Sequence, residues 1–240
     1  MNRLSWGTTL NTILIAAVIL YGEVQAIPQT FHAEYILSSK GMVLGETTYD
    51  LTHIPAEQRE RLTIHTEPTG LAALFVKKII NEESIWEWHN GEIRPLHYRY
   101  DRTGKREKHR SRQFDWEKRT VTLTDNGDSR ELNQLQPNTV DEALFLLALM
   151  HDLEQGNRNL EYKVAKSSHW SDYVFTAGEV ENVTVPAGEF SAIRTTRQKE
   201  GKITFELWSA PDLDHLPVQI EYREKDGTLF SLRLRSSSLQ

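Results

Sequence analysis

The chain contains no cysteine among its 240 residues, which excludes disulfide bonds, thiolate metal sites and cysteine nucleophiles. Its nine histidines form neither a His-Glu-x-x-His motif nor a helical pair four residues apart, so the sequence indicates no metal site and no cofactor. It also lacks a Gly-x-Ser-x-Gly motif, a P-loop and a dinucleotide-binding fingerprint. These absences make an enzyme the weaker class of function.

Positively charged residues are fewer than negatively charged residues. The chain has 28 Lys and Arg against 34 Asp and Glu, a formal net charge of −6. This mild acidity argues against a nucleic-acid partner.

A run of apolar residues long enough to cross a membrane is also missing. The one long run, residues 8–20, is shorter than the roughly 20 residues of a membrane span. It follows Arg3 and precedes Val24-Gln25-Ala26, which is typical of a secretory signal peptide. We therefore predict a signal peptide over residues 1–26 cleaved after Ala26, no membrane anchor, and one all-β domain over 27–240. An exported chain of this size without disulfides fits the bacterial periplasm.

From Phe31 onward, short alternating runs are separated by turn residues every eight to twelve positions. Asn90-Gly91 is the strongest hairpin signal, and Asp226-Gly227 marks another turn. The pattern predicts a mainly β fold, a single curved antiparallel sheet of about a dozen strands, because so many strands curl into a barrel or half-barrel.

Two segments interrupt the β pattern and predict two helices packed on the concave face. In the first, Leu71, Leu74, Phe75 and Ile79 share one helical face, which favours either a lid or the wall of a ligand cavity. The second is predicted over residues 139–155 and is apolar around most of its circumference, so it is expected inside the curve of the sheet. Leu147 from this helix completes the predicted apolar wall.

Several motifs resemble those of the exported bacterial proteins grouped as domain of unknown function 3108. They include Gly45, Gly70-Leu71, Phe114-Asp115-Trp116, residues 186–190 and Leu216-Pro217, spread over nearly all of the mature chain. The resemblance implies an exported, mostly β protein and no established reaction. The closing pattern is more distantly similar to the periplasmic lipoprotein carriers, which are β half-barrels whose helices cover an apolar concave face.

Four cations alternate along one predicted strand, at Arg106, Lys108, Arg110 and Arg112. The spacing places them on one face of the strand. They suit either an anionic group held by guanidinium groups, or a solvated outer face or charged edge strand.

Other candidate residues have simpler interpretations. Trp86, Trp88, Tyr98 and Tyr100 are typical of core or cross-strand packing more than of a sugar-stacking surface. Asp115 more commonly accepts a structural hydrogen bond than acts as an acid. The Asp212–His215 stretch is typical of a polar turn before Pro217, because no nucleophile motif accompanies it.

These observations favour a soluble periplasmic protein that binds or carries an apolar or amphiphilic cell-envelope component, a lipid for example. The alternative is a structural or assembly partner of an envelope protein, without a small-molecule ligand. The third is a hydrolase that uses Asp115 or the Asp212–His215 loop.

Overall fold

The computed structural model describes residues 30–104, 106–166 and 168–239. The predicted signal peptide and its cleavage after Ala26 lie outside these residues. Over the described ranges, none of the helices has the length and apolar character needed to cross a membrane.

One half of the fold is a run of eight strands. They are β1 (Phe31–Ser39), β2 (Met42–Ile54), β3 (Arg59–Pro68), β4 (Lys78–His89), β5 (Glu92–Gly104), β6 (Lys108–Asp115), β7 (Thr120–Asp125) and β8 (Asp128–Asn133). The 3₁₀ turn η1 (Gly70–Leu74) connects β3 to β4.

The other half contains the α-helix and seven strands. They are β9 (Thr139–Val140), α1 (Phe145–Glu154), β10 (Asn159–Ala165), β11 (Trp170–Val185), β12 (Gly188–Lys199), β13 (Lys202–Ala210), the 3₁₀ turn η2 (Pro211–Leu213), β14 (Leu216–Arg223) and β15 (Leu229–Ser237).

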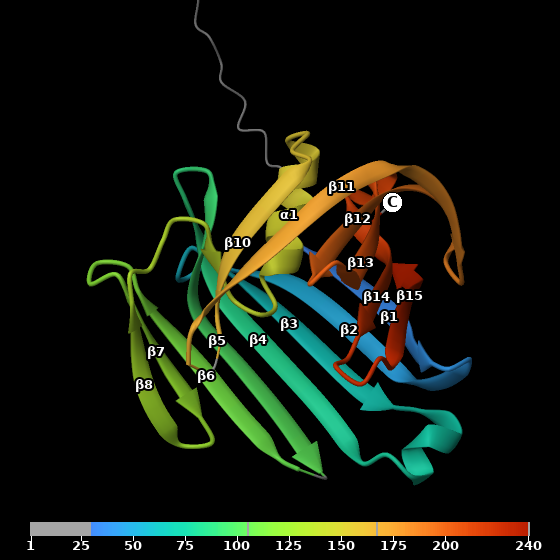
Figure 1. Ribbon diagram of the computed structural model, residues 1–240, viewed down its shortest axis with the longest axis horizontal. Helices are drawn as coiled ribbons and strands as arrows, with labels where there is room; N and C mark the ends of the chain where they lie inside the picture. The colour runs from blue at the N-terminus through green and yellow to red at the C-terminus, as the bar shows by residue number, and fades with distance from the viewer. Residues whose placement is uncertain (1–29, 105, 167, 240) are drawn as a thin grey trace, which may run out of the picture.

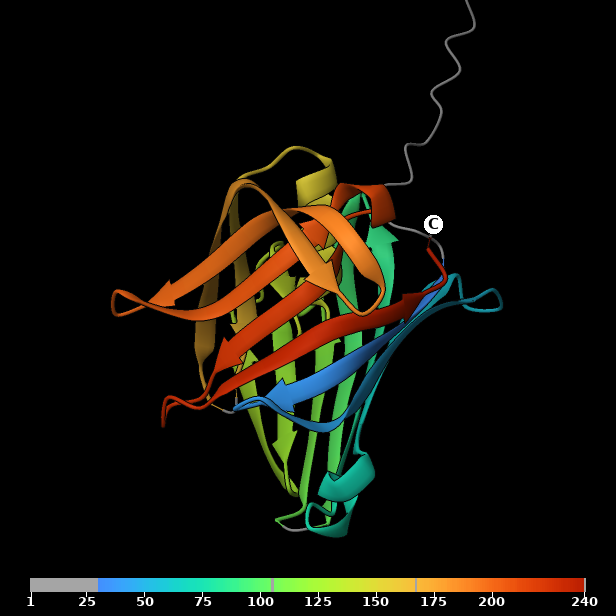
Figure 2. The same cartoon turned by 90° about the vertical axis from the view of Figure 1, so that its right-hand side faces the viewer.

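All the strands belong to one 15-stranded sheet in the order β8-β7-β6-β5-β4-β3-β2-β1-β15-β14-β13-β12-β11-β10-β9. Neighbours are antiparallel, except that β9 runs parallel to β10. The first and last strands pair in the middle of the sheet, whereas the edge strands β8 and β9 are not paired with each other in the described part of the chain. The sheet is therefore open, and it curves around α1 (Figures 1 and 2).

Two local features produce this shape. The pairing of β11 with β12 shifts between Ala177 and Val180, and such a bulge bends a strand. Figure 1 shows β11 and β12 arching over the helix. At the β4–β5 hairpin, Asn90 and Gly91 have φ values of 53° and 80°, which the predicted two-residue turn requires.

The helix α1 lies in the core. Leu146, Leu147, Leu149, Met150 and Leu153 are all buried. The helix is shorter than the predicted 139–155, because Thr139 and Val140 pair with β10 and the helix begins only at Phe145. Asp141 accepts hydrogen bonds from the backbone N–H groups of Ala143 and Leu144, which leads the chain into the helix.

The prediction of a mainly β, open curved sheet is confirmed, but two of its details are wrong. The sheet has fifteen strands rather than about a dozen, and the described chain has one α-helix rather than two. The segment around Leu71 and Phe75 forms only the short turn η1, because Ile79 and Ile80 already pair with β5 and β3 in the sheet. Tertiary strand pairing outweighs the helical spacing there.

Candidate functional site in the concave face

A cavity lies between the start of α1 and the concave face of the sheet, and we call it the interior cavity. Its volume is about 130 Å³. Most of the residues that line it are apolar, and they come from α1 and from strands of both halves of the sheet. The lining includes Tyr49, Ile64, Phe145, Phe205, Ile220 and Tyr222. Two carboxyl groups, those of Glu82 and Glu142, also line it. The cavity thus combines an apolar wall with acidic groups.

Aromatic side chains run beside this cavity in a chain of ring contacts, which we call the aromatic row. Phe145 contacts Phe205 with ring centroids 5.6 Å apart, and Phe205 contacts Tyr222 at 6.4 Å. The row comprises Tyr173, Phe175, Phe145, Phe205, Tyr222 and Phe230. No sequence motif marks these residues as a site, and the available signal is that Tyr173 and Phe175 alternate along one strand.

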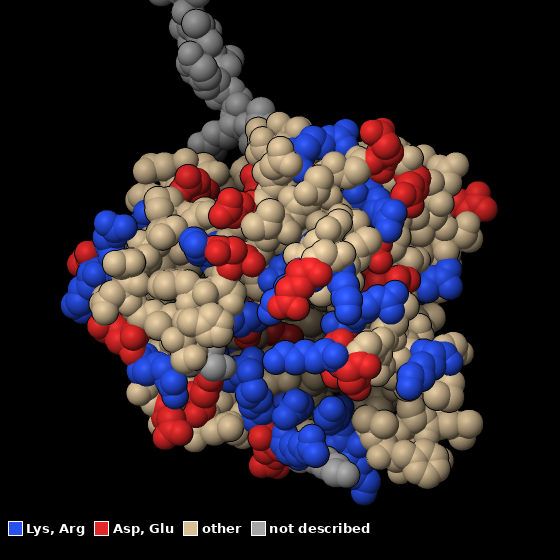
Figure 3. Space-filling view, viewed as in Figure 1, with Lys and Arg blue, Asp and Glu red and all other residues tan. Residues whose placement is uncertain are grey.

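Glu142 joins two cations at the edge of the interior cavity. It accepts a hydrogen bond from the Arg110 guanidinium at 3.2 Å and another from Lys166 Nζ at 2.5 Å. Burial alone would lower the pKa of Lys166, but the nearby Glu142 carboxylate raises it above its usual value. Asp125 extends the group, because its carboxylate lies 3.8 Å from Arg110 and 2.9 Å from Arg112. Three cations are thus linked to the two carboxylates Glu142 and Asp125. Figure 3 shows a hollow near the centre of the view, with Lys, Arg, Asp and Glu side chains around it.

Glu82 lies on β4 and is the second acidic group of the interior cavity. Burial raises the pKa of Glu82 to about 7, against the opposing effect of a hydrogen bond from Tyr98. Near neutral pH this carboxyl group therefore exchanges a proton, and below that pH it is neutral. Protonation removes a negative charge from the cavity.

Asp141 has a structural role beside the cavity. Burial raises the pKa of Asp141 to about 6. Its carboxyl group accepts a hydrogen bond of 2.5 Å from the Ser84 hydroxyl, in addition to the two backbone N–H groups that precede α1. Asp141 therefore ties the start of the helix to β4.

The four cations predicted to share one face of a strand lie in different environments. Arg112 is 1% exposed and donates to the Asp125 carboxylate at 2.9 Å as well as to backbone carbonyls, so it holds strands together. Arg110 is the member that reaches the interior cavity, through Glu142. Burial lowers the pKa of Lys108. Arg106 is exposed at the β5–β6 connection, where its carbonyl accepts hydrogen bonds from Arg102.

The predicted apolar wall is not assembled by the structure. Leu71, Leu74 and Phe75 are 80%, 68% and 86% exposed, and Ile79 is also exposed, so none of them lines the cavity. Leu147 is fully buried in the core. From α1, the residues that line the cavity are Phe145 and Leu146. Glu142 and Ala143, which precede the helix, also line it.

Several of the remaining sequence candidates pack or pair within the fold, whereas Trp88, Asp212 and Asp214 are exposed. Trp86 and Tyr98 are buried in the core, as a packing role requires. Asp115 forms an ion pair of 2.7 Å with Lys118, and this contact holds the pKa of Asp115 below its usual value. His215 is buried, with Nε2 3.0 Å from the Glu154 carboxylate. Among the described residues, no three His, Asp or Glu side chains are placed to hold a metal ion.

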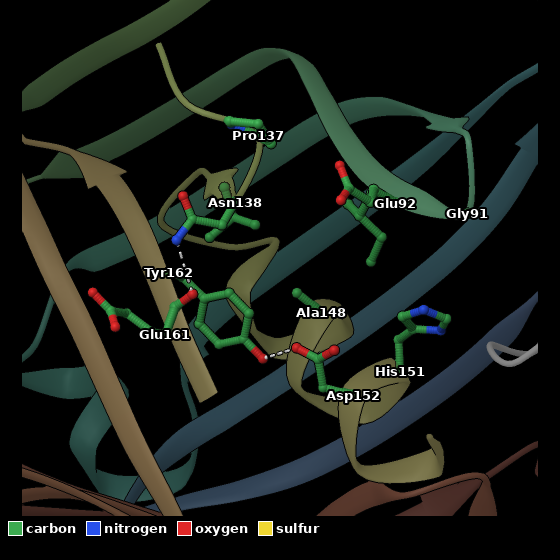
Figure 4. A pocket seen from close by; sticks show the side chains of 11 residues that line it. Gly91, Glu92, Pro137, Asn138, Ala148, His151, Asp152, Glu161 and Tyr162 are labelled. Atoms are coloured by element: carbon green, nitrogen blue, oxygen red, sulfur yellow. Dashed lines mark hydrogen bonds between the residues drawn. The ribbon is translucent and has the colours of Figure 1, made fainter. Parts of the chain in front are cut away.

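A second hollow, of about 170 Å³, lies at the end of the fold where α1 finishes (Figure 4). Tyr162 donates a hydrogen bond of 2.7 Å to Asp152, and Asn138 donates one of 3.1 Å to the carbonyl of Glu161. His151 lies at its edge with its ring 5.2 Å from that of Trp88. Several of its polar groups are thus engaged with one another. The interior cavity is the better candidate for an apolar ligand, because more of its lining is apolar.

Comparison with known proteins adds a family and a fold. The chain belongs to the DUF3108 family, described as "Protein of unknown function", whose model matches residues 31–235. Among solved structures it is similar to a β-barrel-like protein of the domain of unknown function DUF1849 from Brucella abortus. That match has a TM-score of 0.55 and 8% identity, and it covers 88% of this chain and 98% of the other. At this identity the likeness shows the fold alone.

A second solved structure is a provisionally assigned lipoprotein from Parabacteroides distasonis. It is 10% identical with a TM-score of 0.37, and the match covers 89% of this chain and 98% of the other. No curated protein matches the chain.

Proposed function

We propose that this member of the DUF3108 family binds an amphiphilic molecule of the cell envelope in its interior cavity. The apolar part of the ligand would lie against the aromatic row, and an anionic group would bind at Arg110 and Lys166. The observation that carries the proposal is the position of these two cations, one carboxylate away from an apolar cavity.

The aromatic row supports binding of the apolar part. Phe145 and Phe205 belong both to the row and to the cavity lining. A volume of about 130 Å³ is close to that of an apolar cavity that takes one benzene molecule. We therefore expect an acyl chain to enter the cavity with one end and to lie along partly exposed members of the row, Phe205, Tyr222 and Phe230, with the rest.

The charges support binding of an anionic group. Arg110, Arg112 and Lys166 together carry three positive charges, against the two carboxylates Glu142 and Asp125 to which they are linked. A guanidinium also binds carboxylate and phosphate groups through two parallel hydrogen bonds. An anion placed beside Arg110 would share its N–H donors with Glu142. Protonation of Glu82 would strengthen this binding, because it removes a nearby negative charge.

The compartment in this proposal is the periplasm, and its basis is the sequence of residues 1–26. N-terminal sequencing of the protein from a periplasmic extract should start at Ile27. Recovery of a longer chain in the membrane pellet would contradict an exported, cleaved protein.

The first test of the proposal is direct identification of a ligand. We expect that solvent extraction of the protein purified from the periplasm, followed by mass spectrometry, releases one class of acyl-containing molecule in near-stoichiometric amount. The protein after extraction should also bind an environment-sensitive apolar dye saturably, and dodecanoate should displace it. If no lipid is extracted and no dye binds, the alternative role as an envelope assembly partner is favoured.

The second test locates the anionic group. Arg110→Gln should weaken binding of dodecanoate by about tenfold, the effect of one charge-assisted hydrogen bond. Binding of uncharged dodecanol should change much less. Arg99→Gln is the matched control, because Arg99 lies on the neighbouring strand, is exposed and forms an ion pair with Asp101. Equal dodecanoate affinities for both variants would contradict the proposed site.

A further inference from the structure

The connection between β3 and β4 exposes a group of large apolar side chains. Leu71, Leu74, Phe75 and Val76 are 80%, 68%, 86% and 39% exposed. The neighbouring turn between β1 and β2 adds Met42 and Val43, at 61% and 58%. The two turns are joined where the N–H of Thr69 donates to the carbonyl of Leu44. We call these six side chains the apolar tip.

Packing within the fold does not account for the apolar tip. None of the five residues of η1 is buried. The turn projects from the end of the sheet, at the lower end of the molecule in Figure 2. Six large apolar side chains on two adjacent turns make an exposed cluster, and such clusters mark contact surfaces.

Lysines lie within and beside the apolar tip. Residues 39–45 and 68–80 contain Lys40, Lys77 and Lys78 and no acidic residue. Glu46 and Glu67 lie directly outside these segments, where Glu46 is bound by Arg235, and Asp226 lies near Lys40. Lys77 and Lys78 are therefore the main charges of the tip. Lys78 pairs with Gly104, which places Arg102 and Arg106 of the next hairpin at the same end of the sheet. Figure 3 shows the uncharged surface at the lower right, where Figure 1 places η1, next to a concentration of Lys and Arg side chains.

We propose that the apolar tip docks on the surface of an anionic lipid bilayer. Leu71, Leu74 and Phe75 enter the boundary between head groups and acyl chains, while Lys77 and Lys78 contact lipid phosphates. Apolar side chains with flanking lysines are the combination that binds such surfaces, because burial of apolar area and attraction to anionic lipids add. This docking is separate from the proposed function, since it needs no ligand in the interior cavity.

The geometry favours a bilayer over a folded protein partner. A stable protein interface buries about 800 Å² on each side. The apolar tip consists of only two short turns at a projecting end, which suits shallow insertion into a fluid surface better than a broad flat contact. Its cations match the negative charge of lipid head groups.

The test is co-sedimentation of the mature chain with vesicles. Vesicles of phosphatidylcholine mixed with phosphatidylglycerol should bind the protein at low ionic strength, and vesicles of phosphatidylcholine alone should bind it more weakly. Phe75→Ser should lower the affinity for the mixed vesicles by about tenfold, the loss expected for one buried aromatic side chain. The double variant Lys77→Gln/Lys78→Gln should lose about thirtyfold in affinity for the mixed vesicles, and little for phosphatidylcholine alone.

Val180→Ser is the matched control, because Val180 is 56% exposed but lies on β11, away from the tip. Absence of binding to the mixed vesicles at low salt would overturn the proposal, as would equal binding by Phe75→Ser and Val180→Ser. The parent protein could also prove to be a dimer that Phe75→Ser converts to a monomer without a change in vesicle binding. That result would show that the tip binds a second copy of the chain, and it would overturn the bilayer proposal. Dye binding should survive in Phe75→Ser, and vesicle binding should survive in Arg110→Gln, so the two proposals fail separately.

Discussion

The hydroxyl of Tyr98 donates a hydrogen bond of 2.5 Å to the carboxyl group of Glu82 on the adjacent strand. This bond favours the charged form of Glu82, yet burial prevails and raises its pKa to about 7. The folded state therefore binds this proton more tightly than the unfolded state does.

The pKa of Glu82 predicts the sign of a pH effect on stability. In the unfolded chain the group titrates near 4.5, and in the folded chain near 7. Between these values the folded state holds more protons, so the free energy of unfolding falls as the pH rises through this window. Glu82→Gln should remove this loss, on the order of 3 kcal/mol in total. Urea unfolding of parent and variant at both ends of the window measures it, and parallel pH profiles would contradict the assignment.

The buried position of Leu147 predicts the outcome of a charged substitution. Leu147→Asp should prevent folding, because an unpaired buried carboxylate costs several kcal/mol. Leu71→Asp places the same residue at a position that is 80% exposed, and it should fold like the parent. Circular dichroism and thermal melting distinguish the two. A melting temperature for Leu147→Asp within a few degrees of the parent would show that α1 is not buried as described.

Two phenylalanines should differ sharply on truncation. Phe175 is 1% exposed within the aromatic row, so Phe175→Ala should lower the free energy of unfolding by roughly 3–5 kcal/mol. Phe75 is 86% exposed, so Phe75→Ala should change it by less than about 0.5 kcal/mol. Denaturant unfolding of both variants checks this, and a core-sized loss at Phe75 would mean that η1 packs against the fold.

Gly45 of β2 pairs with Pro68 of β3. A Cβ atom at Gly45 would stand 2.1 Å from the carbonyl oxygen of Glu67, so the strands would have to separate. Gly45→Ala should therefore destabilise the protein by roughly 1–3 kcal/mol. Gly178→Ala is the control, because its Cβ would stand 3.2 Å from the nearest backbone oxygen, that of Arg194. Thermal melts that show equal effects would contradict the close approach at Gly45.

The sequence by itself determined the class of the fold and the placement of its main elements. Alternating side chains along residues 31–239 specify strands, because period-two patterning buries one face of a sheet. Asn90-Gly91 specifies a tight hairpin, because these residues adopt positive φ at little cost. A fully apolar stretch around Leu147 specifies a buried helix. Each of these signals depends on neighbouring residues alone.

Tertiary structure alone decided the fate of the segment around Phe75 and the composition of the site. Helical spacing at Leu71, Leu74 and Phe75 was overridden because Ile79 and Ile80 pair with strands on both sides. Arg110 and Lys166 meet at Glu142 although they are far apart in sequence. Arg112, two residues from Arg110, is buried instead. A strand pattern assigns a side chain to a face, but the curvature of the sheet and the position of α1 determine which groups on that face touch.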